Sequence, residues 1–262
     1  MTLLATAPSE SPTTQTDSSC CPIVELRQYT LHPGQRDVLI DLFDREFIET
    51  QEALGIRVIG QFRDLDRPDY FVWLRGFSDM ESRLQALTTF YSGPVWKTHR
   101  EAANATMIDS DDVLLLHPVR PESGFPAETR ERMPIDSPEV AKGLLVATIY
   151  HLNAPAGPEL LDYFEQTVAP VAAECGLRIL ASFVTEGSPN TYPRLPIREG
   201  EEVFVWFAMV RDAAEYEESV AALGRSERWK GVIEGEGGLG RWVKGAPEIL
   251  RLTPTGRSRL RG

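Results

Sequence analysis

The sequence predicts an α+β protein made of two tandem ferredoxin-like βαββαβ units, and three observations indicate this. GIRVIGQF at 55–62 returns as GLRILASF at 176–183, which is 121 residues later. The tripeptide Phe-Val-Trp at 71–73 returns at 204–206, which is 133 residues later. The Pro- and Gly-rich stretch 189–200 explains the difference, because a loop insertion in the second copy lengthens the spacing.

Each copy shows the strand and helix signals of such a unit in the same order. Alternating, β-rich stretches predict four strands per copy, and apolar stripes with helical spacing predict the segments between them. Gly55 follows the first stripe, as a C-cap glycine does. The predicted strands are 23–30, 56–63, 70–77, 112–117, 144–151, 177–184, 202–210 and 248–252. The predicted helices are 35–54, 79–91, 94–106, 157–175, 212–223 and 225–234.

The βαββαβ order gives an antiparallel four-stranded sheet with helices on one face. The other face would be a large exposed apolar patch, so we expect the two sheets to pack together as an internal pseudo-dimer. The expected organisation is a disordered tail (1–21), a first domain (22–118), a linker (119–142) and a diverged second domain (143–254). The chain is expected to be a monomer with this internal pairing, or a homodimer.

The composition excludes several function classes. The formal net charge of −12 argues against nucleic acid and anionic membranes as partners. The cysteines Cys20, Cys21 and Cys175 show no zinc-ligand spacing, so no metal site is predicted. An odd number of cysteines and the lack of a long apolar run predict a cytoplasmic protein without a membrane span. No cofactor is predicted.

Strand alternation assigns side chains to the two faces of the first sheet. Val24 and Leu26 form an apolar face, which we assign to the helices, so Glu25, Arg27 and Tyr29 are predicted to point into the space between the sheets. This places a polar and aromatic pocket there, typical of a small-molecule site. The predicted ligand-binding residues are Glu25, Arg27, Arg57, Gln61, Trp73 and Arg75. The alternative is that these charges only satisfy one another inside the fold.

The second copy lacks most of this polar set, since Thr148 stands where the first copy has Arg27. We therefore expect the first copy to keep the site and the second to act mainly as a lid.

Four segments resemble the NIPSNAP family of the dimeric α/β-barrel superfamily. They are ELRQYTLHPG (25–34), GIRVIGQFRD (55–64), FVWLRGF (71–77) and YSGPVWKTHREAANATM (91–107). The resemblance is strong over 24–117 and weak over 144–253. It implies that the two units form a barrel, but it implies little about activity, because the family has no well-defined reaction.

Three functions remain open at this point. The first is a small-molecule-binding or accessory protein with a pocket in the barrel. The second is a cofactor-independent oxygenase, isomerase or cyclase acting on a hydrophobic metabolite, in which Tyr29 or His99 moves a proton. His99 is chosen because it lies in the segment WKTHR that resembles the family, whereas the second copy has Val232 there. The third is a structural protein whose cavity is filled by its own side chains.

Overall fold

The computed structural model describes residues 19–127, 130–135, 137 and 140–262. In the first half the strands are Ile23–Leu31 (β1), Arg57–Asp64 (β2), Tyr70–Phe77 (β3) and Met107–Pro118 (β4). The helices are Arg36–Leu42 (α1), Ile48–Glu52 (α2), Met80–Ser92 (α3) and Pro94–Asn104 (α4). A π-helical turn, Phe43–Phe47, joins α1 and α2 into one continuous helix.

The second half has the same order of elements. Its strands are Leu144–His151 (β5), Ile179–Thr185 (β6), Val203–Val210 (β7) and Glu248–Pro254 (β8). Its helices are Pro158–Tyr163 (α5), Ala169–Glu174 (α6), Ala213–Arg225 (α7) and Glu227–Glu234 (α8), with a short 3₁₀ turn at Leu239–Arg241. A π-helical turn again interrupts the first helix of the half, at Phe164–Val168, 121 residues after the turn at Phe43–Phe47.

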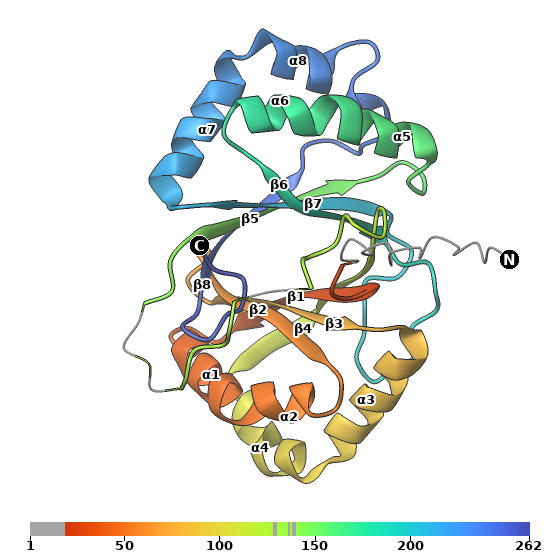
Figure 1. Ribbon diagram of the computed structural model, residues 1–262. Helices are drawn as coiled ribbons and strands as arrows, with labels where there is room; N and C mark the ends of the chain where they lie inside the picture. Colours follow the sequence, from red (N-terminus) through yellow and green to blue (C-terminus); the bar gives the residue numbers. More distant parts are fainter. Residues whose placement is uncertain (1–18, 128–129, 136, 138–139) are drawn as a thin grey trace, which may run out of the picture.

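The strands form a closed barrel in the order β1-β3-β2-β8-β5-β7-β6-β4, with antiparallel pairing throughout. The two halves meet edge to edge, where Asp64 of β2 pairs with Leu252 of β8 and Leu116 of β4 pairs with Thr185 of β6. Figure 1 shows the helices of the two halves on opposite sides of the barrel. This mixed α/β fold with a closed antiparallel barrel confirms the barrel-like class predicted from the sequence.

Apolar side chains from both halves fill the barrel interior. The buried cluster that joins the two halves contains strand and loop residues but no helix residue, so it lies on the inner face of the strands. It includes Val24, Leu26, Val72 and Leu74 from the first half and Leu145, Phe183, Val205, Phe207 and Leu252 from the second. Side chains on the other face of the strands pack with helix residues in separate clusters.

The predicted assignment of faces is therefore wrong. Glu25, Arg27 and Tyr29 share a face with Leu31, which packs under the first-half helices, whereas Val24 lies inside the barrel. Trp73 and Arg75 also lie on the helix-facing side, in register with Arg27 and Glu25. The prediction failed because both faces of this sheet are buried. The more apolar face then packs inside the barrel, where no polar partner is available, and the polar face meets helices that carry polar partners.

Segments outside the strands and helices also belong to the folded core. Cys21 is 2% exposed and packs in the barrel cluster, so the end of the predicted disordered tail is folded, while residues 1–18 lie outside the described part of the chain. Phe125, from the predicted linker, packs against Phe183 and Phe207 of the second half. Leu260 near the C-terminus also joins the barrel cluster.

Candidate functional site

Four charged side chains meet in the layer between the first-half strands and helices. The Glu25 carboxylate accepts hydrogen bonds from Arg27 at 2.6 Å, from Arg75 at 2.7 Å and from Arg83 at 2.7 Å. Register places Glu25 opposite Arg75, and α3 supplies Arg83. None of the four side chains is more than 1% exposed. We call these four residues the arginine cluster.

The arginine cluster has an excess of two positive charges, because three guanidinium groups surround one carboxylate. Burial alone would raise the pKa of Glu25, but Arg75, Arg27 and Arg83 outweigh burial and hold this pKa well below its usual range. The Nη2 atoms of Arg75 and Arg83 are buried without a hydrogen-bond partner among the described residues. Because an uncompensated buried charge is costly, negative charge brought near this cluster is stabilised.

Tyr29 lies beside the cluster and joins it to the aromatic side chains of the layer. Arg27 Nε donates a hydrogen bond to the Tyr29 hydroxyl at 3.0 Å. The Tyr29 and Trp73 rings meet edge to face with 6.0 Å between their centroids, and the guanidinium of Arg75 lies 5.0 Å from the Trp73 ring centroid. The structure thus brings together five of the residues predicted from the sequence, namely Glu25, Arg27, Tyr29, Trp73 and Arg75.

Arg57 and Gln61 are separate from this group. Arg57 donates to the Ala127 carbonyl at 2.5 Å and is in register with Gly76, one position away from Arg75. Gln61 is in register with Trp73, and both polar atoms of its side-chain amide are buried without a partner among the described residues. The hydrogen bonds to the Glu25 carboxylate come from Arg27, Arg75 and Arg83, and not from Arg57 or Gln61.

His99 is also apart from Tyr29, the other predicted catalytic residue. Its Nε2 lies 3.4 Å from a carboxylate oxygen of Glu46, and the His99 side chain is 29% exposed. His99 lines neither the apolar cavity, nor the hollow between β4 and β6, nor the hollow beside Tyr29, whereas Tyr29 lines the last of these. The two residues predicted to move a proton therefore do not share a site in this structure.

The sequence did not reveal that the inserted loop 189–200 covers the first half. Arg83 Nη1 donates to the Thr191 hydroxyl at 3.2 Å, and the ring of Tyr192 stacks on Tyr91 of α3 with 5.8 Å between centroids. In Figure 1 this loop descends from the second half to the end of α3. Its Pro-rich composition indicated a loop, but no sequence signal told which half the loop would contact. Arg83 was missed because a lone helix arginine usually faces solvent.

A cavity of about 570 Å³ occupies the corresponding layer of the second half. Strands β5, β7 and β8 and helices α7 and α8 contribute its walls. None of its lining residues within the described chain is Asp, Glu, Lys, Arg or His. We call it the apolar cavity; its main apolar walls are Leu177, Trp206, Leu223, Trp229, Ile233 and Leu239.

The first half holds buried charges in this layer, whereas the second half holds a cavity. The strand register explains part of this difference. Thr148 is opposite Trp206 in β5 and β7, as Arg27 is opposite Trp73 in β1 and β3. A threonine thus stands in the second half where the first half holds a buried arginine. The neighbouring pair Glu25 and Arg75 is likewise replaced, by Val146 and Ala208.

The helices explain the rest of the difference between the filled first-half layer and the second-half cavity. Helices α3 and α7 each have 13 residues and each begin after an aspartate whose side chain caps the first turn. With the 133-residue spacing, Tyr216 takes the position of Arg83, and Gly224 takes that of Tyr91. A side chain that fills the first-half layer is therefore missing in the second half, where the space around Gly224 is open.

Four lining residues of the apolar cavity carry an uncharged polar side-chain group, namely Thr148, Tyr150, Trp206 and Tyr216. Burial raises the pKa of the Tyr150 hydroxyl to about 12, and the nearby Trp206 side chain offsets part of this rise. The indole N–H of Trp206 is itself buried and makes no hydrogen bond of normal geometry within the described chain. The cavity thus offers a few uncharged hydrogen-bonding groups on largely apolar walls.

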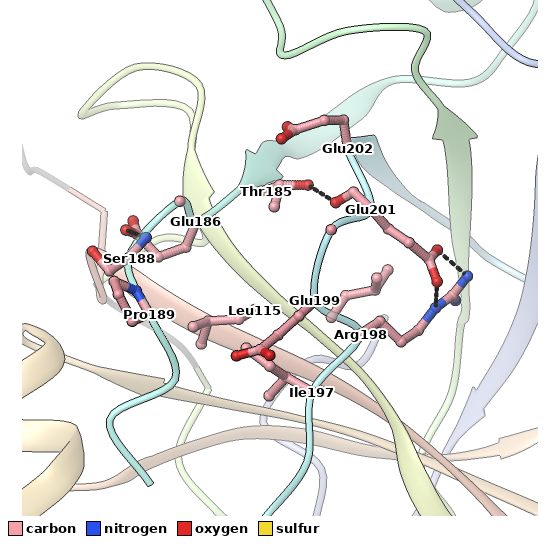
Figure 2. A pocket seen from close by; sticks show the side chains of 13 residues that line it. Leu115, Thr185, Glu186, Ser188, Pro189, Ile197, Arg198, Glu199, Glu201 and Glu202 are labelled. Atoms are coloured by element: carbon pink, nitrogen blue, oxygen red, sulfur yellow. Dashed lines mark hydrogen bonds and ion pairs between the residues drawn. The ribbon is translucent and has the colours of Figure 1, made fainter. Parts of the chain in front are cut away.

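A second hollow, of about 250 Å³, lies at the seam where β4 meets β6; we call it the seam hollow. Figure 2 shows its acidic lining and the Arg198 guanidinium against the Glu201 carboxylate, with 2.5 Å between the nearest atoms. Several carboxylates line the seam hollow, namely those of Glu186, Glu199, Glu201 and Glu202. In the described part of the chain, no group of three or more His, Cys, Asp and Glu side chains is arranged to hold a metal ion.

The fold and the layer between strands and helices define an α/β-barrel protein. Residues 24–121 match the NIPSNAP family model, so the first half of this chain contains a NIPSNAP domain. The resemblance predicted from the sequence is thus confirmed. No curated protein matches the chain in sequence.

Solved structures share the whole architecture at low sequence identity. A presumed monooxygenase from Fusobacterium nucleatum is 9% identical, with a TM-score of 0.52, and the match covers 93% of this chain and 96% of that one. A presumed monooxygenase from Lactobacillus acidophilus is 15% identical, with a TM-score of 0.50 and coverage of 91% and 98%. A NIPSNAP family protein from Agrobacterium tumefaciens is 20% identical over 37% of this chain and 92% of its own, with a TM-score of 0.35. At these identities the two full-length matches establish the fold alone.

Among the described residues, no helix is both long and apolar enough to cross a membrane.

Proposed function

We propose that this protein binds an uncharged, largely apolar small molecule in the apolar cavity of its second half. The observation that carries this proposal is a cavity of about 570 Å³ without a charged lining residue in the described chain. Small-molecule sites are typically roughly 300–1,000 Å³, apolar, and equipped with a few polar groups. The proposed pocket therefore lies between strands and helices, and not in the barrel interior, which apolar side chains fill.

The buried Trp206 N–H, which makes no hydrogen bond of normal geometry with the described residues, supports a ligand that carries a hydrogen-bond acceptor. A buried donor without a partner costs free energy, and a carbonyl or ether oxygen of a ligand would remove that cost. A charged ligand is disfavoured because the cavity offers no ionic partner.

The lining supports binding more than acid–base catalysis. The ionisable cavity residues are Tyr150 and Tyr216, and burial raises the pKa of both hydroxyls, so both stay protonated at neutral pH. They can donate hydrogen bonds, but they cannot accept a proton as a general base. The two full-length structural matches are presumed monooxygenases. They support an alternative function, an oxygenase that acts on a hydrophobic metabolite and uses the same cavity as its substrate pocket.

The two halves support a common origin as tandem ferredoxin-like units. The repeated element order, the equal registers of β1–β3 and β5–β7 and the two equivalent π-helical turns support this duplication. A duplicated chain can keep a binding cavity in one copy and fill it in the other.

The neutral fluorophore N-phenyl-1-naphthylamine tests the proposed site. Gly224→Tyr puts back the side chain that fills the first-half layer, and open space surrounds the Cβ position. We expect the wild-type protein to enhance the probe's fluorescence on binding, and Gly224→Tyr to weaken that binding by about tenfold or more.

Gly231→Tyr is the matched control, because Gly231 is exposed on α8, has open space around it and does not line the cavity. It should bind the probe like the wild type. Equal probe binding by the wild type and Gly224→Tyr, with both proteins folded by circular dichroism, would contradict the proposed site.

A further inference from the structure

A hollow of about 370 Å³ opens in the first half, beside the arginine cluster. Tyr29, Tyr91 and Trp96 of the first half line it, and Tyr192 of the inserted loop completes its aromatic walls. The Tyr91 ring contacts Trp96 at 4.9 Å and stacks on Tyr192 at 5.8 Å, between centroids. We call it the aromatic hollow. Flat rings arranged in this way are suited to an aromatic ligand.

The surroundings of the aromatic hollow are positively charged, although the chain carries a net charge of −12. Arg100 and Arg194 line it, and neither forms an ion pair with a described residue, while Asp111 supplies one negative charge. The arginine cluster behind Tyr29 adds its two uncompensated positive charges. Since opposite charges attract strongly where burial lowers the effective dielectric, an anion is favoured here.

The Tyr29 hydroxyl provides a directed contact between the cluster and the aromatic hollow. It accepts a hydrogen bond from Arg27 Nε at 3.0 Å, and the described residues provide no acceptor for its own hydrogen. A hydroxyl that accepts from a guanidinium becomes a stronger donor. Tyr29 can therefore donate to an oxygen of a ligand in the hollow.

We propose that the aromatic hollow is a second ligand site, which binds an aromatic carboxylate. The aromatic walls contact the ring, and the Tyr29 hydroxyl, Arg100 and Arg194 recognise the carboxylate. This site differs from the apolar cavity in the charge of its ligand, and it does not depend on the function proposed for that cavity.

Calorimetric titration of the full chain with 2-naphthoate, and with its uncharged analogue 2-acetylnaphthalene, tests the proposal. We expect the wild type to bind 2-naphthoate more tightly than the analogue. The double variant Arg100→Gln/Arg194→Gln should weaken 2-naphthoate binding by about tenfold, and Tyr29→Phe should weaken it severalfold, while both keep the ring contacts.

The double variant Arg45→Gln/Arg225→Gln is the charge-matched control, since both arginines are exposed and neither lines the aromatic hollow. It should leave 2-naphthoate binding unchanged, as should Gly224→Tyr. The proposal is overturned by absent 2-naphthoate binding, by equal binding of the two ligands, or by equal affinity of the two arginine double variants. Loss of binding in Gly224→Tyr would also overturn it, because it would place the anion in the apolar cavity.

Discussion

The two halves of this protein share one backbone plan but use the layer between strands and helices in opposite ways. In the first half, four buried charged residues and a set of aromatic rings occupy that layer, beside the aromatic hollow of about 370 Å³. In the second half, smaller or uncharged residues at equivalent positions leave a cavity of about 570 Å³. The fold therefore tolerates either an ionic network or an apolar space in the same place. A homodimer of identical subunits could not use its two layers differently, because each substitution would appear in both of them.

Glu25→Ala should produce the largest loss of stability. It would leave three buried guanidinium groups without their carboxylate, and breaking a buried ionic network in this way typically costs about 3–5 kcal/mol. The equivalent Val146→Ala in the second half should cost only about 1–2 kcal/mol, because it removes two methyl groups. Urea denaturation of the two variants checks this comparison. Equal losses would contradict the charge imbalance.

Replacing the whole arginine cluster by its second-half counterparts sharpens the same comparison. The variant Glu25→Val/Arg27→Thr/Arg75→Ala/Arg83→Tyr should be more stable than Glu25→Ala alone, since no uncompensated charge remains. Its unfolding midpoint in urea measures the difference. A variant less stable than Glu25→Ala would show that the first half requires its ionic network.

Tyr91→Gly should have an intermediate effect, because it imitates Gly224 in the first half. It removes the ring contacts with Trp96 and Tyr192 and places a glycine in a helix, for a total of about 2–3 kcal/mol. In a Gly224→Tyr background, it should restore binding of N-phenyl-1-naphthylamine by opening the first-half layer. Tyr91→Phe, which keeps the ring, is the control and should restore no binding.

Asp44→Asn should give the smallest change, and the change should depend on pH. Burial raises the pKa of Asp44 to about 6, although Arg257 and Arg132 act against it, and one carboxylate oxygen is buried without a partner within the described chain. A carboxyl with a raised pKa in the folded state destabilises the fold above that pKa. Asp44→Asn should therefore raise stability by about 1–2 kcal/mol at pH 8.

This gain should fade as the pH falls through about 6 toward the ordinary pKa of an aspartate. Glu165, which is 121 residues further along the chain, occupies the corresponding position of the second half and pairs with Arg120 on the surface. Glu165→Gln should therefore show no such gain. Thermal melts at pH 5 and pH 8 distinguish the two variants.

Much of this fold could be predicted from the sequence, because repeats and alternation report local structure directly. The spacings of 121 and 133 residues identified both halves, their strands and the inserted loop. The residues of the first-half site were also mostly identified, since Glu25, Arg27, Tyr29, Trp73 and Arg75 do meet.

The orientation of the site and its second-half counterpart could not be predicted. Alternation shows which residues share a face, but when both faces are buried it does not show which face the helices cover. The apolar cavity depends on side chains that are small or absent, such as Thr148 and Gly224, and these carry no motif. We expected the second half to act mainly as a lid over the first; within the described chain, the loop 189–200 contacts the arginine cluster, while the second half packs around its own cavity.

The closed ring of strands also determines how molecules can enter and leave. Parting the two halves would break both short ladders, β2–β8 and β4–β6, and expose the apolar barrel interior to water. Hinge opening between the halves is therefore energetically unfavourable. The apolar cavity is instead reached from the outer surface of the second half, where its lining residues Val220 and Ile249 are 44% and 46% exposed.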